Sequence, residues 1–590
     1  MATETTAPGP AWCALGRTSD GEIALVDIAA DGRRSESLLL TPDRLPEQVA
    51  RREQQADDNA APPPRWIWSD APAWYPALLT TGVRVERCHD LRLIHAILRH
   101  SQLVVDPTAI REAAAWDVPV EPPSEDVPRG ATLFDLDTAA ATTRAGVPDS
   151  IEEVLEEFER QRHAIDHSSD PARLRLLVAA ESAGALIAAE LRAAGIPWDV
   201  EEHDRILTAD LGPRPRPGHS PALMVEVAAQ VREALGDPLL SLDSPPRLLR
   251  ALHRSGIDVR STSRWELAEH DHPAIEPLLR YKKQSRLLTA NGWAWMDEWV
   301  HEGRYRPVYV PGGVVTGRWA SSGGGALQIP RQLRPALRAD PGWLLVSADV
   351  SQLEPRVLAA MARDRAMARA GSGTDLYAGI VEAGVVATRQ EAKVGVLGAL
   401  YGGTAGDSGR IVPRLRRTFP DAMRLVDGAA ETGERGGTVS TLLGRSSPPP
   451  ETSWTEAQRH ANLPDAAPAE QERARRSARD RGRFTRNFVV QGTAAEWALS
   501  WMAGLRLALS RFEEVPPDHA APTSGPVFAR RAHLAFFLHD EVIVHAPAQQ
   551  AEAAAQAIQD AADAAGRLLF PGSPVDFPLD LTITERSPSK

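Results

Sequence analysis

The distribution of apolar and polar positions predicts strands near both ends of the chain and helices between them. Short apolar runs flanked by turn residues predict early strands at 12–15, 23–28 and 65–68. Longer stretches that repeat apolar residues at helical spacing predict helices at 151–165 and 173–194. At 590 residues, the chain is long enough for roughly four domains. The pattern therefore predicts a multidomain α/β protein.

The stretch at 343–364 changes from a strand pattern to a helix pattern within a few residues. Residues 344–348 form an apolar run, Asp349 follows directly, and apolar residues recur at helical spacing from Leu353. A carboxylate at a strand end before a helix start is well placed to hold a divalent cation near phosphates. An Asp that only caps the following helix is the alternative interpretation of this stretch.

A second acidic position lies between two predicted strands near the C-terminus. Apolar runs on both sides of His539-Asp540-Glu541 predict a strand pair over 534–546 that turns at these polar residues. Adjacent acids in a turn are usually only solvated, but here the two strands fix their position. Asp349 and Asp540 together would chelate two Mg²⁺ ions, which prefer a few carboxylates plus substrate phosphates. Such a metal pair serves phosphoryl transfer.

Between the two carboxylates lies a helical stripe with mixed chemistry. Arg389, Lys393, Leu397 and Tyr401 are spaced by four, which places them along one face over about 18 Å. The two cations suit a triphosphate, and the apolar and aromatic residues suit a base. A stripe that serves only helix packing is the alternative.

Composition and charge limit the remaining possibilities. The net charge of −13 is unusual for a nucleic-acid binder, but residues 302–338 hold six arginines and one acid, and residues 471–486 hold seven arginines and two acids. A basic channel and a solvated basic face both fit. No apolar run is long enough to span a membrane, and two cysteines do not make a disulfide framework. We therefore expect a cytoplasmic protein without membrane attachment.

Six segments in order resemble a known family. They are Thr316–Ser322 with Leu327–Pro330, Asp349–Glu354, Arg389–Gly402, Thr441–Arg445, Asn487 with Gln491–Ala495, and His539–Glu541. In this order they resemble DNA polymerases of family A, the class of bacterial DNA polymerase I. The actinobacterial chains labelled bifunctional 3′–5′ exonuclease and polymerase are the most similar. The resemblance covers about residues 175 to 590, and the 191 positions from Asp349 to Asp540 (540 − 349 = 191) can hold a fingers domain inserted into a palm.

The resemblance implies a palm, fingers and thumb polymerase behind a degenerate exonuclease domain of RNase H-like fold. In chain order, the implied domains are an exonuclease-type domain at 1–165, a thumb at 166–303, a first palm part at 304–372, fingers at 373–486 and a second palm part at 487–590. A Pro/Ala-rich linker is expected near 105–150, and a flexible insertion near 446–470.

The resemblance also implies site residues. Asp349 and Asp540 would bind two Mg²⁺ ions with Glu541 in support, and Lys393 would donate a proton to the leaving pyrophosphate. The implied nucleotide-binding residues are Arg389, Lys393, Leu397, Tyr401, Gln352 and Glu354. Within this group Tyr401 would close the nascent pair, and Glu354 would exclude a ribose 2′-hydroxyl. The implied DNA-binding residues are Thr316, Arg318, Arg483, Asn487, Gln491 and His539. This chain departs from the family at Val350, Pro355 and Leu397. At 397 the family has an aromatic ring, so we expect altered sugar discrimination.

The N-terminal third is expected to lack proofreading. The resemblance at Cys88–Leu98 suggests an exonuclease domain, which needs several carboxylates around two metals, including Asp-x-Glu on the first strand. The only early Asp-x-Glu, Asp20-Gly21-Glu22, falls in a predicted turn, and Trp74 occupies the place of a second metal-binding Asp. Asp70 and Asp90 are the remaining candidates.

Three alternatives stay open beside a DNA polymerase without proofreading. These are a bifunctional polymerase with an active 3′–5′ exonuclease, a catalytically idle DNA-binding structural factor, and an enzyme that copies RNA templates. The complete set of Asp349, Asp540, Arg389 and Lys393 argues against the idle factor, and Glu354 favours deoxynucleotides. The expected partners are primer–template DNA and dNTPs, and we expect a monomer associated with the nucleoid.

Overall fold

The computed structural model describes residues 10–58, 62–118, 146–325, 329–373, 375–403 and 406–587. Its contacts divide the chain into two compact units. Unit 1 comprises Met1–Ala194, Val308–Gly323 and Gly342–Ile583, and unit 2 comprises Gly195–Pro307, Gly324–Pro341 and Thr584–Lys590. Of the segments quoted for the family resemblance, residues 327 and 328 lie outside the described residues.

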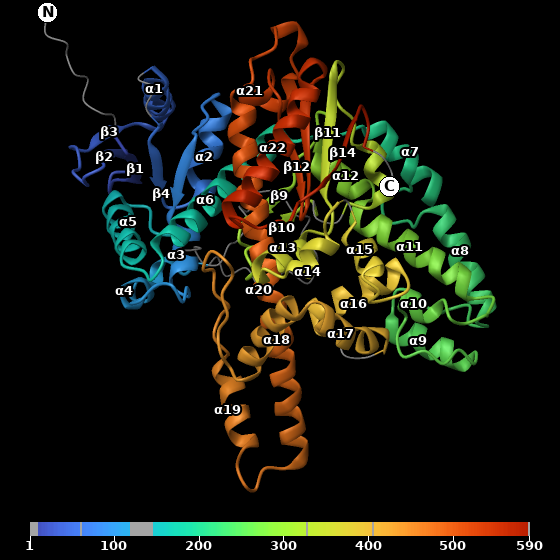
Figure 1. Ribbon diagram of the computed structural model, residues 1–590. Helices are drawn as coiled ribbons and strands as arrows, with labels where there is room; N and C mark the ends of the chain where they lie inside the picture. The colour runs from blue at the N-terminus through green and yellow to red at the C-terminus, as the bar shows by residue number, and fades with distance from the viewer. Residues whose placement is uncertain are drawn as a thin grey trace, which may run out of the picture. The chain divides into compact units, whose positions relative to one another are not determined.

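The N-terminal part of unit 1 is a five-stranded sheet in the order β3-β2-β1-β4-β5 (Figure 1). Its strands are β1 Trp12–Arg17, β2 Ile23–Ile28, β3 Leu38–Leu40, β4 Arg65–Trp68 and β5 Arg87–Asp90. β1, β2 and β3 pair antiparallel, whereas β1, β4 and β5 run parallel. Alternate side chains enter different cores: Leu15 packs on one face and Ala14 on the other. The expected turn at 19–22 joins β1 to β2, with Gly21 at φ 81°.

Six helices accompany this sheet. They are α1 Leu45–Asp58, α2 Ala71–Thr80, α3 Leu91–Leu98, α4 Thr108–Glu112, α5 Ile151–Asp166 and α6 Pro171–Ala194. The predicted linker near 105–150 is partly structured, because α4 buries Ile110 and a following 3₁₀ turn buries Trp116. Isolated apolar residues in a Pro/Ala-rich segment thus anchor it to the domain. Residues 119–145 of this linker lie outside the described residues. We call the sheet with α1–α5 the N-terminal domain.

A second sheet in unit 1 has the order β12-β13-β11-β14. Its strands are β11 Trp343–Val350, β12 His533–Leu538, β13 Glu541–Pro547 and β14 Leu579–Thr584, and the helix α22 Ala551–Leu569 packs on it (Figure 1). β11 and β13 pair antiparallel with Val346 opposite Val544. The adjoining segment of unit 1 forms the hairpin β9 Val308–Val310 and β10 Ala320–Gly323.

The helices between β11 and β12 surround one long helix, α20 Pro468–Ser510. The others are α13 Leu353–Ala362, α14 Arg365–Ala370, α15 Leu376–Glu382, α16 Arg389–Tyr401, α17 Gly406–Thr418, α18 Pro420–Glu434, α19 Thr452–Ala461 and α21 Gly525–Phe528. The 43 residues of α20 extend about 64 Å at the usual helical rise. α20 packs against α18 and α19 and also against α22 and α6.

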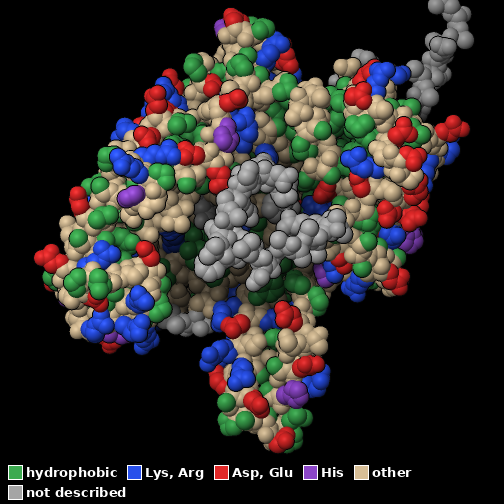
Figure 2. Space-filling view, turned by 180° about the vertical axis from the view of Figure 1, so that it is seen from behind, with side chains coloured by type: hydrophobic (Ala, Val, Ile, Leu, Met, Phe, Trp, Pro, Cys, Tyr) green, Lys and Arg blue, Asp and Glu red, His purple; other side chains and the backbone are tan. Residues whose placement is uncertain are grey.

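One expectation for this region differs from the structure. The flexible insertion near 446–470 contains the helix α19 and the start of α20, which begins at Pro468. Residues 468–483 are mostly charged, so they lack the apolar stripe by which a helix is recognised from sequence. Figure 2 shows both basic and acidic side chains on the projecting part of unit 1 that α19 and α20 form. The arginines at 475, 476 and 479 are exposed, as the solvated-face alternative predicts.

Unit 2 is mainly helical. Its elements are β6 Ile196–Pro197, α7 Val200–Leu211, α8 Ala222–Ala234, α9 Pro245–Arg254, α10 Arg264–Leu267, α11 Ile275–Asn291, α12 Trp293–Trp299, β7 Val300–His301 and β8 Arg304–Tyr305. Its aromatic core contains Trp198, Trp295 and Tyr305, with ring centroids 4.8–5.7 Å apart. The predicted thumb, 166–303, overlaps this unit but also includes α6. The structure groups α6 with unit 1, because α6 packs against α2 and α20.

Candidate active site

The two predicted metal-binding carboxylates meet at one end of the second sheet. The β11–β13 register places Asp349 opposite Glu541, and the Val350 amide donates a hydrogen bond of 2.9 Å to the Asp540 carbonyl. The turn between β12 and β13 has His539 at φ 56°. Burial, followed by the nearby charge of Asp349, raises the pKa of Asp540 to about 7. The long-range pairing therefore brings the Asp349 and Asp540 carboxylates together.

This donor set fits Mg²⁺ that is shared with a phosphate ligand. Among the described residues, no group of three or more His, Cys, Asp or Glu side chains makes a self-sufficient metal site. Mg²⁺ commonly takes one or two carboxylates and completes its shell with water and substrate phosphates. Asp349 is exposed, Asp540 is partly buried and Glu541 is buried beside them. Two neighbouring carboxylates that repel each other suit a divalent cation.

The helix α16 presents its predicted stripe to solvent. Thr388 and Glu391 form a capping box that begins the helix, which accounts for its start at Arg389. The opposite face is close to α17: a Cβ built on Gly395 would lie 2.4 Å from Ile411. Arg389 and Lys393 are exposed, and Lys393 makes no hydrogen bond or ion pair with any described residue. The packing of the small residues thus leaves the cationic face open.

Glu354 joins α13, α16 and the segment before the second sheet. Its carboxylate forms an ion pair with Arg318 and accepts a hydrogen bond of 2.6 Å from the Tyr401 hydroxyl. Burial and Glu354 raise the pKa of Tyr401 to about 12, and Gln491 also interacts with this hydroxyl. Burial lowers the pKa of the His539 imidazole, and the nearby positive charge of Arg318 lowers it further. Glu354 therefore links the α16 stripe to the carboxylate turn.

Arg389 has a protein carboxylate as its partner in this structure. Its Nε atom donates to Asp375 Oδ2 at 2.5 Å, and its guanidinium lies 5.5 Å from the ring centroid of Tyr377. Asp375 also caps α15 by accepting from the amides of Tyr377 and Ala378. Sequence reasoning missed Asp375 because an Asp before a helix is an ordinary cap. Its proximity to Arg389 depends on the α15–α16 packing.

The other predicted nucleotide and DNA contacts are more dispersed. Gln352 begins α13 at φ 50°, and its Oε1 accepts from the Leu376 amide at 3.1 Å. Thr316 is buried, and its hydroxyl has no hydrogen-bond partner among the described residues. Asn487 is partly buried on α20, and the exposed Arg483 forms an ion pair with Asp480. No hydrogen bond or ion pair among the described residues connects Asn487 or Arg483 to the carboxylate pair.

The segment Thr441–Arg445 is fixed by buried acids that sequence reasoning missed. Thr441 donates a hydrogen bond to Glu496 on α20, and the Leu443 amide donates to the same carboxylate at 3.0 Å. Arg445 forms an ion pair of 2.6 Å with Glu181 on α6. Burial raises the pKa of Glu496 to about 7. The motif thus acts here as a buried connection between α6 and α20.

The N-terminal domain fills its candidate metal positions with structural contacts. Arg17 donates to Asp149 at 2.9 Å, and its guanidinium lies 5.1 Å from the Trp74 ring centroid. The Trp74 indole and Ser69 hydroxyl also donate to Asp149, at 3.1 and 2.7 Å. Both carboxylate oxygens of Asp149 are thus bonded to protein side chains.

The leftover acidic candidates in this domain serve as helix caps. Asp70 caps α2 and lies 3.4 Å from the guanidinium of Arg92. Asp90 is fully buried, caps α3 and accepts a second amide hydrogen bond from Ala71 at 2.8 Å. Backbone amides therefore occupy the carboxylate oxygens that a metal would need.

Comparisons with known proteins agree with this geometry. The family model described as DNA polymerase family A matches residues 224–583. DNA polymerase I of Chloroflexus aurantiacus is 29% identical over 349 residues, which cover 54% of this chain and 33% of that protein. The thermostable DNA polymerase I of Thermus aquaticus is 27% identical over 430 residues, which cover 63% of this chain and 47% of that protein. The chain thus spans about a third to a half of the length of these relatives.

A solved structure matches nearly the whole chain. It is the POL domain of Pol1 from M. smegmatis, in complex with DNA primer–template and dNTP. The match has a TM-score of 0.63 at 17% identity and covers 98% of this chain and 95% of that one, which establishes a shared fold. No helix in the described part of this chain is long and apolar enough to cross a bilayer. Because the family model covers more than half of the chain and the fold agrees, the chain belongs to DNA polymerase family A.

Proposed function

We propose that this protein is a DNA-directed DNA polymerase that adds deoxynucleotides to a primer 3′ end. The observation that carries the proposal is the meeting of Asp349 and Asp540 beside the exposed cationic stripe of α16. The two parts are joined through Glu354, which contacts both Tyr401 and Arg318. Family membership and a fold relative bound to primer–template and dNTP support the same activity.

Each group in the site has a proposed role. Asp349 and Asp540 would hold two Mg²⁺ ions, which activate the attacking oxygen and stabilise the leaving one in phosphoryl transfer. Arg389 and Lys393 bind the triphosphate, and Lys393 supplies a proton to the departing pyrophosphate. Glu354 excludes a ribose 2′-hydroxyl, while Tyr401 covers the nascent pair. The remaining proposed contacts to nucleotide or DNA are Gln352, Leu397, Thr316, Arg318, Arg483, Asn487, Gln491 and His539.

We assign the thumb to unit 2, the palm to the second sheet and the fingers to α15–α19 with the first half of α20. The mixed five-stranded sheet supports an RNase H-like fold for the N-terminal domain. The Arg17–Asp149–Trp74 contact supports loss of proofreading, because Arg17 and Trp74 engage both carboxylate oxygens of Asp149. We further propose that the protein is a monomer and that it binds primer–template DNA in the cytoplasm.

A primer-extension assay tests this function directly. A 5′-labelled primer–template is incubated with Mg²⁺, with and without dNTPs, for wild type and Asp349→Ala. We expect extension by wild type alone and no shortening when dNTPs are withheld. Shortening that persists in Asp349→Ala, after purification excludes contaminants, would establish the bifunctional alternative. Absence of extension with retained DNA binding would favour the idle structural factor.

Leu397 gives a prediction about sugar selection. Leu397→Phe is expected to favour dNTP over dideoxynucleotide incorporation by roughly tenfold. An aromatic ring beside the sugar is larger than the leucine side chain and therefore tightens the selection of the sugar's shape. The volume-conserving variant Leu397→Met should behave as wild type. The measurement is the ratio of kcat/KM for the two nucleotides. Equal ratios for wild type and Leu397→Phe would remove Leu397 from sugar discrimination.

Asp375 gives a prediction about nucleotide affinity. Asp375→Asn is expected to lower the KM for dNTP, because the charge of Asp375 no longer competes with the triphosphate for Arg389. An exposed ion pair contributes about 0–1 kcal/mol, so the KM should fall by up to about fivefold. Asn preserves the α15 cap. Steady-state kinetics with saturating primer–template provide the measurement. A higher KM would mean that Asp375 orients Arg389 for the nucleotide.

A further inference from the structure

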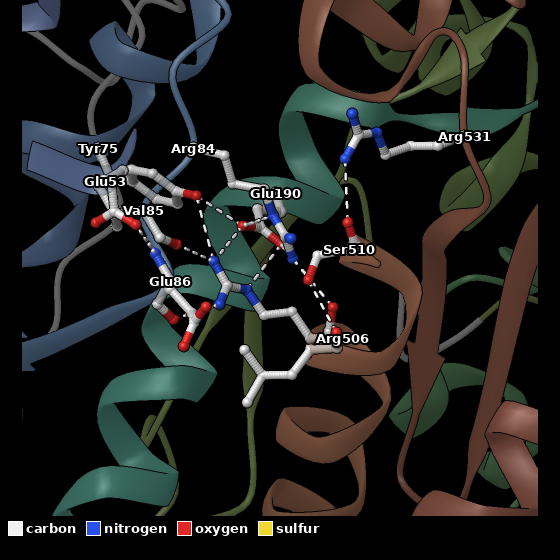
Figure 3. Close-up of polar contacts among 10 residues, drawn as sticks. Glu53, Tyr75, Arg84, Val85, Glu86, Glu190, Arg506, Ser510 and Arg531 are labelled. Atoms are coloured by element: carbon white, nitrogen blue, oxygen red, sulfur yellow. Dashed lines mark hydrogen bonds and ion pairs between the residues drawn. The ribbon is translucent and has the colours of Figure 1, made fainter. Parts of the chain in front are cut away.

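A buried polar network joins the N-terminal domain to α6 and to the end of α20 (Figure 3). Arg506 is 2% exposed, and both oxygens of Glu190 accept from it, at 2.6 and 3.0 Å. The Arg506 guanidinium also donates to the carbonyls of Val85 and Glu86, at 2.5 and 2.7 Å. One side chain of α20 therefore satisfies backbone acceptors of the N-terminal domain.

The same network includes two side chains of the N-terminal domain. Tyr75 donates to Glu190 at 2.6 Å, and Arg84 donates to Glu190 at 2.9 Å and to the Arg506 carbonyl at 3.3 Å. Burial raises the pKa of Glu190, but the two guanidinium charges outweigh it and lower the pKa to about 2. Each member of this network has its partner in another chain segment. Removing Glu190 would leave the charges of Arg84 and Arg506 without their carboxylate.

Apolar packing adjoins this network. The core that includes Tyr75 and Val85 also contains Trp66 and Trp68 of β4, Leu186 of α6 and Phe528 of α21. Flexible domain attachments normally have smaller and more polar interfaces. A shared core of this kind makes the N-terminal domain a fixed part of unit 1.

A second junction connects the N-terminal domain to residues 438–446, which we call the 438–446 loop. Ser101 donates to the Gly444 carbonyl at 2.7 Å. The Gln102 side-chain oxygen accepts from Ser440 at 2.7 Å, and the Gln102 backbone amide donates to Ser446 at 2.9 Å. Gly444 has φ 105°, and a Cβ at this position would lie 2.3 Å from Leu103. The loop thus approaches the N-terminal domain as closely as its backbone allows.

The 438–446 loop in turn contacts the proposed primer-binding residues. A Cβ built on Gly492, next to Gln491, would lie 2.4 Å from Thr441 and 3.1 Å from the Thr316 carbonyl. A Cβ on Gly317, next to Arg318, would lie 2.6 Å from Arg445. The loop is therefore closely packed against Thr316–Arg318 and α20. A chain of close contacts therefore runs from Ser101 to the proposed primer site.

We propose that the N-terminal domain has been retained as a positioning platform for primer–template binding. It holds the end of α20 through Arg506 and the 438–446 loop through Ser101 and Gln102. Neither junction uses the filled positions around Asp149, so the platform does not need exonuclease chemistry. The inference rests on the proposed polymerase function, because the positioned residues are its proposed DNA contacts.

The first experiment measures mechanical coupling in the full chain and does not need activity. Arg506→Met is compared with Arg511→Met, which changes an exposed arginine at the same end of α20. Hydrogen exchange of Arg506→Met should be at least tenfold faster both in residues 75–86 and at the end of α20, with no change in Arg511→Met. Arg506→Lys should restore part of the protection because it keeps the charge. Faster exchange confined to α20 would overturn the platform.

The second experiment measures positioning with a variant that keeps the buried charges intact. Ser101→Ala/Gln102→Ala is compared with Val105→Ala, an exposed position in the same segment. We expect a five- to tenfold higher Kd for primer–template and a kcat within twofold of wild type at saturating DNA. An unchanged Kd would overturn the positioning role. If wild type itself fails to extend primers, the proposed function fails, while hydrogen exchange still decides the coupling.

Discussion

Asp540→Asn is expected to lower kcat for primer extension at least about a thousandfold while the fold persists. A metal ion contributes several kcal/mol of transition-state stabilisation, and each 1.36 kcal/mol corresponds to a factor of ten in rate. Asn keeps the shape of the side chain but removes the charge that holds the ion. Single-turnover extension with saturating primer–template, dNTP and Mg²⁺ provides the measurement.

The stability of this variant separates lost chemistry from misfolding. Asp540 and Asp349 repel each other, so neutralising one of them should not lower the unfolding temperature of the metal-free protein. Asp563→Asn, an exposed change on α22, serves as the matched control and should extend primers at the wild-type rate. A metal role for Asp540 would be contradicted if Asp540→Asn retained more than a tenth of the wild-type rate.

Lys393→Ala is expected to lower kcat about 10²- to 10⁴-fold, the usual contribution of a positioned general acid. Lys393 is one of four lysines among 62 arginines and has no partner among the described residues. Its ammonium is therefore free to meet a triphosphate and to give up a proton. The measurement is the single-turnover rate together with the dNTP Kd from its concentration dependence.

Lys393→Arg separates proton transfer from charge. Arginine keeps the positive charge but does not release its proton in proteins, so nucleotide affinity should stay within a fewfold of wild type while the rate remains low. Lys283→Ala, which changes an exposed lysine in unit 2, is the control and should leave the rate unchanged. A wild-type rate for Lys393→Arg would show that Lys393 contributes charge alone.

In the N-terminal domain, Trp74 and the candidate acidic residues make structural contacts. Its Asp149, Trp74 and Arg17 satisfy one another, and Asp70 and Asp90 cap helices. Through Arg506 and Ser101, this domain would instead position the primer–template. Hydrogen exchange and the Kd for primer–template test this role without any measurement of nuclease activity.

Local patterns in the sequence were sufficient for the parts of the site that lie within one element. Continuous apolar runs placed β11, β12 and β13, and the turn residues placed Asp540 between the last two. The spacing of four put Arg389, Lys393 and Tyr401 on one face of α16. These features follow from short-range geometry, which neighbouring residues specify by themselves.

Elements whose structure depends on packing with distant segments were harder to predict from local patterns. The first half of α20 has few apolar residues, so its helix is visible only through its contacts with α18 and α19. The segment 105–118 looked like a linker, because two buried residues, Ile110 and Trp116, do not form a periodic pattern. The limits of the predicted thumb also depended on which unit α6 packs against.

The contacts that complete the site were decided by the tertiary structure alone. Asp375 reaches Arg389 across 14 positions, Tyr401 reaches Glu354 across 47, and Arg506 reaches Glu190 across 316. Each residue by itself is compatible with a cap, a core or a solvated face. The sequence by itself determined the family and the elements that carry the candidate site. Only the fold decided which charges are paired, because pairing depends on distances between elements that no local pattern specifies.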